Sequence, residues 1–132
     1  LGADHAVPPG EEAVALVQQL THAQGAQLVL DIVGTDDTLQ LAARMGRRMG
    51  HITIVGIGGG TLPVSFMTLP NECAVCSPYW GTISELHEVV ALASAGRIRM
   101  TTERVPLDGA LAAYARLERG EVAGRVVVTP NG

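Results

Sequence analysis

The chain has 132 residues, a formal net charge of −4 at pH 7 and 47% apolar side chains, few of them aromatic, which allows one modest domain with an aliphatic core. The basic residues form no run and do not alternate with aromatic side chains, so a nucleic-acid-binding protein is not expected. The sequence shows neither a signal peptide nor an apolar stretch of about 18 residues that could span a membrane, so we expect a soluble, cytoplasmic protein.

The first half of the chain predicts alternating strands and helices. Residues 3–7 predict a short strand that two prolines end, and residues 11–22 predict an amphipathic helix. Strands follow at residues 28–33 and 52–57. The helix between them is capped by Thr35 or Asp36, runs to about Met45 and turns Leu39, Ala42 and Ala43 inward. This order, with short connections, predicts a parallel sheet with right-handed crossovers.

The second half predicts shorter elements. The segment from Leu62 to Phe66 is extended, and its proline confines it to an edge of the sheet. A strand is expected at residues 73–79, a further extended segment at residues 98–104 and a last strand at residues 126–128. A helix begins at Thr82, with Glu85 completing a capping box, and a second helix at residues 108–117 is capped by Asp108. The first of these helices carries an apolar stripe that we expect to be buried: Leu86, Val89, Val90 and Ala93.

Glycines follow two of the most apolar predicted strands. Gly34 ends the first run, and the second continues into a loop with glycine at residues 56 and 58–60. This loop is not the dinucleotide fingerprint G-x-G-x-x-G, because Thr61 stands where the last glycine belongs and no helix follows directly. It is either a loop that a flat ligand approaches closely, since ligands bind at the carboxyl ends of strands in open α/β sheets, or an ordinary flexible loop.

A few polar and aromatic residues are candidates for chemistry, each with a structural alternative. Asp31 lies in an apolar strand, where it is either functional or accepts hydrogen bonds near the strand end. Cys73 and Cys76 form a C-x-x-C pair but lack the further ligands and the helix start of zinc and redox sites, so we interpret them as small strand residues. Trp80 either lines a ligand pocket or fills space at the edge of the domain. Arg125 either binds a phosphate or is a solvated surface residue.

Five segments in this order together resemble the medium-chain, zinc-type alcohol dehydrogenase superfamily. They are Leu-Gly-Ala-Asp-His-Ala-Val (1–7), Val-Leu-Asp-Ile-Val-Gly (29–34), Ile-Val-Gly-Ile-Gly-Gly-Gly-Thr-Leu-Pro (54–63), Tyr-Trp-Gly-Thr (79–82) and Gly-Glu-Val-Ala-Gly-Arg-Val-Val-Val-Thr-Pro (120–130). The resemblance implies an α/β fold, a partial Rossmann-like parallel sheet of strands three to six with flanking helices, truncated at the N-terminus. Residues 1–81 would be the second part of the NAD(P)-binding domain, and residues 82–132 would return toward a catalytic domain outside the chain.

The resemblance also implies a role for particular residues of this chain. The cofactor is NAD or NADP, and backbone groups of Val55, Pro78 and Trp80 would hold the nicotinamide carboxamide. The implied cofactor-binding residues are Val33, Gly34, Val55, Gly56, Ile57, Pro78, Tyr79, Trp80 and Arg125, with Arg125 on the pyrophosphate. No residue of this chain is assigned to catalysis or to a metal, because the family's zinc belongs to the catalytic domain.

The resemblance gives partners and a function for the parent enzyme. It would transfer hydride between an alcohol or carbonyl substrate and nicotinamide, and the chain alone would be inactive. The segment from Leu62 to Phe66 matches the edge strand used for dimerisation, which predicts a homo-oligomer. Two alternatives stay open: a fragment of a zinc-independent quinone or enoyl reductase of the same superfamily, and a non-catalytic oligomerisation module.

Overall fold

The computed structural model describes residues 2–131, which form two compact units, Gly2–Trp80 and residues 81–131. The first unit contains α1 (Glu11–Leu20), β1 (Ala26–Asp31), α2 (Asp36–Met45), β2 (Gly46–Ile54) and β3 (Ala74–Cys76). The second contains α3 (Ile83–Ser94), β4 (Thr102–Pro106), a 3-10 turn (Leu107–Gly109), α4 (Ala110–Glu118) and β5 (Arg125–Thr129). Over residues 2–131, every helix is too short or too polar to cross a bilayer.

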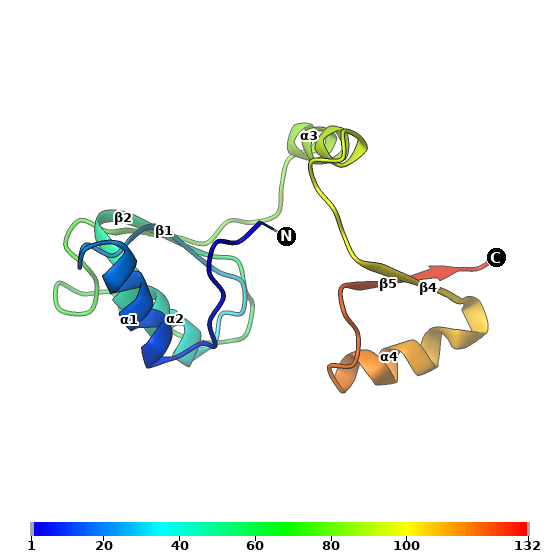
Figure 1. Ribbon diagram of the computed structural model, residues 1–132, viewed down its shortest axis with the longest axis horizontal. Coiled ribbons are helices and arrows are strands. Elements are labelled where there is room, and N and C mark those ends of the chain that lie inside the picture. Colours follow the sequence, from blue (N-terminus) through cyan, green and yellow to red (C-terminus); the bar gives the residue numbers. More distant parts are fainter. Residues whose placement is uncertain (1, 132) are drawn as a thin grey trace. The chain divides into compact units, whose positions relative to one another are not determined.

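The first unit is built on a parallel three-stranded sheet in the order β1-β2-β3. Helix α2 packs against β1 and β2, and α1 lies beside α2 (Figure 1). Ile52 of β2 is fully buried, and the predicted inward residues of α2, Leu39, Ala42 and Ala43, are buried as well. The predicted fold class, an α/β protein with a partial Rossmann-like parallel sheet, is confirmed.

Both central strands begin and end earlier in the chain than predicted: β1 begins at Ala26 rather than at residue 28, and β2 at Gly46 rather than at residue 52. Strand β1 ends at Asp31 rather than at residue 33, and β2 ends at Ile54 rather than at residue 57. Beyond these points the N–H groups of Val33 and Gly34 bond to the Asp31 side chain, while those of Val55 and Gly56 bond to the Asp31 carbonyl. The Val55 bond is the last rung of the parallel ladder. The ladder stops there because the Val33 N–H turns to the Asp31 side chain, and the Gly56 N–H shares the carbonyl that Val55 already uses.

Two predicted strands do not form. Residues 3–7 have no regular structure, because a lone extended segment without a neighbouring strand has nothing to pair with. The segment from Leu62 to Phe66 is irregular and enters a turn, in which the Thr68 hydroxyl donates to the carbonyl of Pro63. Pro63 offers no N–H, and the Ser65 and Thr68 side chains bond locally instead of leaving the backbone free to pair. The oligomer expected through this segment stays a prediction.

Two other predicted elements form, but differently. The predicted strand at residues 73–79 shortens to Ala74–Cys76. The helix expected from Asp108 begins at Ala110, after a 3-10 turn that contains Asp108, and no side chain caps it. Strand β5 covers the predicted residues 126–128 and pairs in parallel with β4.

Helix α3 confirms one prediction and contradicts another. Thr82 and Glu85 form the predicted capping box: the Glu85 N–H donates to the Thr82 hydroxyl, and the Thr82 N–H donates to the Glu85 carboxylate. The stripe of Leu86, Val89, Val90 and Ala93 is exposed rather than buried, and α3 has no buried residue. The stripe is therefore an apolar face that no element of its own unit covers.

Candidate functional site

The loops that leave β1 and β2 are joined through the backbone of Asp31. Its carbonyl accepts hydrogen bonds from the N–H groups of Val55 and Gly56, at 2.8 and 3.0 Å. Further along, the Gly58 N–H donates to the Val33 carbonyl at 2.9 Å, and the Gly60 N–H donates to the Gly34 carbonyl at 2.8 Å. Four backbone donors at the end of β2 and in the loop after it are therefore satisfied by Asp31 and by the loop that follows Asp31. The two loops thus form one joined edge at the carboxyl ends of the strands.

The side chain of Asp31 holds the loop that follows β1 and links it to α2. Asp31 is only 6% exposed, and its Oδ1 accepts from the N–H groups of Val33 and Gly34, each at 2.9 Å. Its Oδ2 accepts from the Thr38 hydroxyl of α2 at 2.8 Å. Burial by itself raises the pKa of Asp31, but the hydrogen bonds from Val33, Gly34 and Thr38 outweigh it and hold the pKa below its ordinary value. Of the two interpretations of Asp31, the strand-end acceptor is confirmed.

The glycines are required because the two loops touch through their backbones. A Cβ added to Gly56 would collide with the backbone of Val33, and one added to Gly34, whose φ is +77°, would collide with the backbone of Gly56. Only residues without a side chain allow this approach. The glycine loop is thus a tight junction of two strands rather than a flexible connection.

The predicted residues Pro78, Tyr79 and Trp80 follow β3. The Ser77 hydroxyl donates to the Ile54 carbonyl at 3.3 Å, so this segment leaves the sheet next to the end of β2. Tyr79 and Trp80 stack edge to face with ring centroids 5.9 Å apart, and Trp80 is 81% exposed. Trp80 also has φ +55°, a left-handed conformation that is unusual for a bulky side chain and that often marks functional sites.

The side chains at this edge are apolar and open. Val33 and Val55 are about half exposed, and Ile57 is almost fully exposed at 99%. A hollow of about 320 Å³ lies beside them, lined by glycines 58–60 and by the first turn of α2 with Asp36 and Asp37. These carboxylates disfavour a phosphate group in the hollow, whereas an uncharged flat ring suits the apolar edge.

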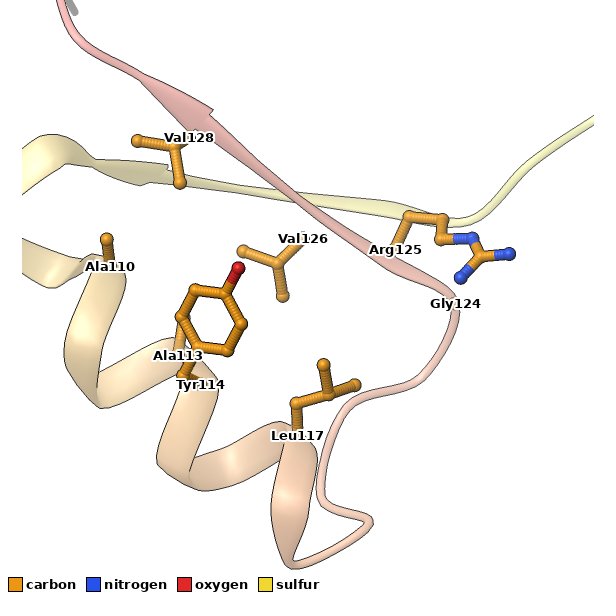
Figure 2. A pocket seen from close by; sticks show the side chains of 8 residues that line it. All are labelled: Ala110, Ala113, Tyr114, Leu117, Gly124, Arg125, Val126 and Val128. Carbon is orange, nitrogen blue, oxygen red and sulfur yellow. The ribbon is translucent and has the colours of Figure 1, made fainter. Parts of the chain in front are cut away.

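Arg125, the remaining predicted residue, lies in the second unit at the start of β5. Its N–H donates to the Thr101 carbonyl at 2.9 Å. Tyr114, Leu117 and Val126 line an apolar hollow of about 210 Å³ between α4 and β5, while the Arg125 guanidinium points away from it (Figure 2). The guanidinium takes part in none of the ion pairs formed within residues 2–131.

The described residues do not fit a zinc ion. Nowhere in residues 2–131 do three or more His, Cys, Asp or Glu side chains come together as metal ligands. Cys73 and Cys76 are both free thiols, and burial raises the pKa of Cys73. Cys76 contacts a single potential ligand, the imidazole of His51, which is too few for a structural or a catalytic zinc site.

Comparison with known proteins decides the family. The profile of the zinc-binding dehydrogenase family matches residues 1–95. This chain belongs to that family. The resemblance to medium-chain alcohol dehydrogenases is thereby confirmed.

Individual relatives support the same family assignment. The chain is 33% identical to the D-arabinose 1-dehydrogenase (NADP(+)) of Saccharolobus solfataricus and 28% identical to an NAD-dependent alcohol dehydrogenase of Sulfurisphaera tokodaii. Each match covers 98% of this chain, but only 37% and 38% of the relatives. The crystal structure of the alcohol dehydrogenase from Aeropyrum pernix superposes with a TM-score of 0.84 and 34% identity, over 98% of this chain and 38% of that one. The relatives are oxidoreductases, and their names imply a nicotinamide cofactor.

Sequence reasoning missed two features of this region. The first is the carbonyl of Asp31, which joins the loops and which no side-chain pattern reveals. The second is the contact between His51 and Cys76, which are far apart in the chain. The register of β2 and β3 places Thr53 opposite Cys76 and His51 opposite Ala74, so the strand register would have revealed this cluster.

Proposed function

We propose that the first unit of this chain is the nicotinamide-binding part of an NAD(P)-dependent, zinc-type alcohol dehydrogenase. The observation that carries the proposal is the joined edge built on Asp31, where two glycine loops meet at the ends of adjacent parallel strands. Parallel α/β sheets bind ligands at this end. The family and the nicotinamide-dependent relatives support the same assignment.

The chain's own contribution is to orient the cofactor. The exposed side chains of Val33, Val55 and Ile57 offer an apolar surface to the nicotinamide ring. Backbone groups of Val55, Pro78 and Trp80 would hold its carboxamide and so select the ring face that meets the substrate. Holding two reactants in a fixed geometry is what proteins contribute to such reactions. When bound, the cofactor supplies or accepts the hydride exchanged with an alcohol or carbonyl group.

The remaining assignments follow from the same proposal. Arg125 would contact the pyrophosphate through its guanidinium, which suits phosphate oxygens. The residues described here do not fit zinc, so no zinc-dependent step is assigned to them. We expect the chain alone to bind dinucleotides weakly and to turn over no alcohol.

The lone tryptophan provides the test. Trp80 is the only tryptophan of the chain, and it lies within the proposed site. Titration with reduced nicotinamide mononucleotide should quench its fluorescence in a saturable way, whereas adenosine monophosphate, which lacks the nicotinamide, should leave the emission unchanged. Equal quenching by both ligands, or none by the first at concentrations up to about 10 mM, would contradict the proposal.

A further inference from the structure

A second cluster lies on the sheet, on the face opposite α2. Ile52 points toward the helix and is fully buried, so His51 and Thr53, its neighbours along β2, point to the other face. Cys76 of β3 is in register with Thr53. Its Sγ lies 3.1 Å from His51 Nε2 and 3.6 Å from Thr53 Oγ1. A thiol, a base and a hydroxyl thus meet on one exposed surface.

The two cysteines of this chain differ in exposure and in the groups that contact the thiol. Cys76 is exposed and contacts an imidazole. Cys73 is partly buried, its thiol contacts the carbonyl of Ala74 at 3.7 Å, and its pKa is raised by burial. Reactive cysteines are accessible thiols beside a base or a positive charge, and buried thiols are inert. The contrast lies within a single molecule, so each cysteine serves as a control for the other.

We propose that Cys76 is a site of reversible thiol–disulfide exchange with low-molecular-weight disulfides, and that His51 serves as its general base. The thiol proton passes to His51 Nε2, and the thiolate attacks one sulfur of the disulfide. A new S–S bond forms as the old one breaks, and the departing thiolate takes up the proton that His51 received. The balance is one protein thiol and one small disulfide in, one mixed disulfide and one small thiol out.

The mixed disulfide is expected to persist on Cys76. Residues three apart in an extended segment are about 10 Å apart and point to opposite faces. A disulfide requires Cα atoms within about 7 Å, so Cys73 cannot displace the adduct without a rearrangement of the strand. The expected product therefore carries a single adduct, with Cys73 still reduced.

The test is the rate of reaction with an aromatic disulfide, followed by intact mass and by peptide mapping on the full 132-residue chain. Cys76 should react about ten times faster than Cys73. His51→Gln should reduce the rate at Cys76 by a similar factor and leave the rate at Cys73 unchanged. His87→Gln, a matched change on α3, should alter neither rate. Added imidazole should restore the rate at Cys76 in a His51→Ala variant and have no effect on Cys73. This rescue would not occur if His51 had a purely structural role.

A further comparison does not depend on how the variants fold. In the unmodified protein, the rate at Cys76 should be higher in the native chain than in the urea-unfolded chain, with each rate normalised to that of a small thiol under the same conditions. A rate at Cys76 that is equal to or below its unfolded value, equal labelling of both cysteines, or an internal Cys73–Cys76 disulfide as the main product would overturn the proposal.

Discussion

Removal of the Asp31 side chain tests the joined edge directly. In Asp31→Ala, the buried N–H of Gly34 loses its acceptor, which costs about 1–3 kcal/mol. The N–H of Val33 is less buried and can bond to water, and the Thr38 hydroxyl can turn to the Thr35 carbonyl, which lies 3.2 Å away, so each of these losses costs about 1 kcal/mol. Together the structure predicts a loss of about 3–5 kcal/mol in the free energy of unfolding.

The same argument predicts how three variants rank by their loss in the free energy of unfolding. Asp31→Asn keeps an oxygen for the N–H groups of Val33 and Gly34 and should cost only about 1–2 kcal/mol. Asp37→Ala, in the exposed first turn of α2, is the matched control and should cost less than about 1 kcal/mol. Urea unfolding followed by far-UV circular dichroism measures these differences, and amide hydrogen exchange at Gly34 locates them. A loss below about 1 kcal/mol in Asp31→Ala, or equal losses in the Ala and Asn variants, would refute the reasoning.

Two further predictions follow from the same edge. The pKa of Asp31 is lower in the folded chain than in the unfolded one, so its stabilising effect is present above about pH 4 and is lost as the pH falls through the folded value. Unfolding measured between about pH 5 and pH 2 should therefore show a smaller loss of stability in Asp31→Asn than in the unmodified chain, and parallel curves would contradict this. Gly56→Ala should cost about 2 kcal/mol or more, because its Cβ meets the backbone of Val33, whereas Gly81→Ala, which has only the flexible Glu85 side chain nearby, should be nearly neutral in the same unfolding assay.

Much of the fold was predictable because local signals and hydrophobic periodicity agree. The Thr82–Glu85 capping box and the inward face of α2 are determined within a few residues and form as predicted, and of the two predicted caps of α2, Thr35 and Asp36, Thr35 is the one that forms. The parallel order of the sheet followed from the alternation of strands and helices. Of the two roles that the sequence allowed for Asp31, the structure shows the acceptor near a strand end, since an aspartate there bonds to neighbouring N–H groups.

The features that the sequence did not predict correctly depend on residues far away in the chain. Residues 3–7 have the composition of a strand but no neighbouring strand, and the apolar stripe of α3 has nothing in its own unit to cover it. The early ends of β1 and β2 follow from the bond of the Val33 N–H to the Asp31 side chain and from the shared use of the Asp31 carbonyl by Val55 and Gly56, which hydrophobic periodicity does not encode. The contact between Cys76 and His51 depends on the register of two strands, and no spacing along the chain indicates it.

The central claim is that the nicotinamide binds at the edge formed by the ends of β1, β2 and β3. Backbone amide chemical shifts, recorded by NMR during titration with reduced nicotinamide mononucleotide, test it most directly. The account predicts saturable shifts concentrated at residues 33–34, 55–57 and 79–80, and their weakening in Gly56→Ala. Shifts that saturate elsewhere in the chain while these amides stay unchanged would contradict it.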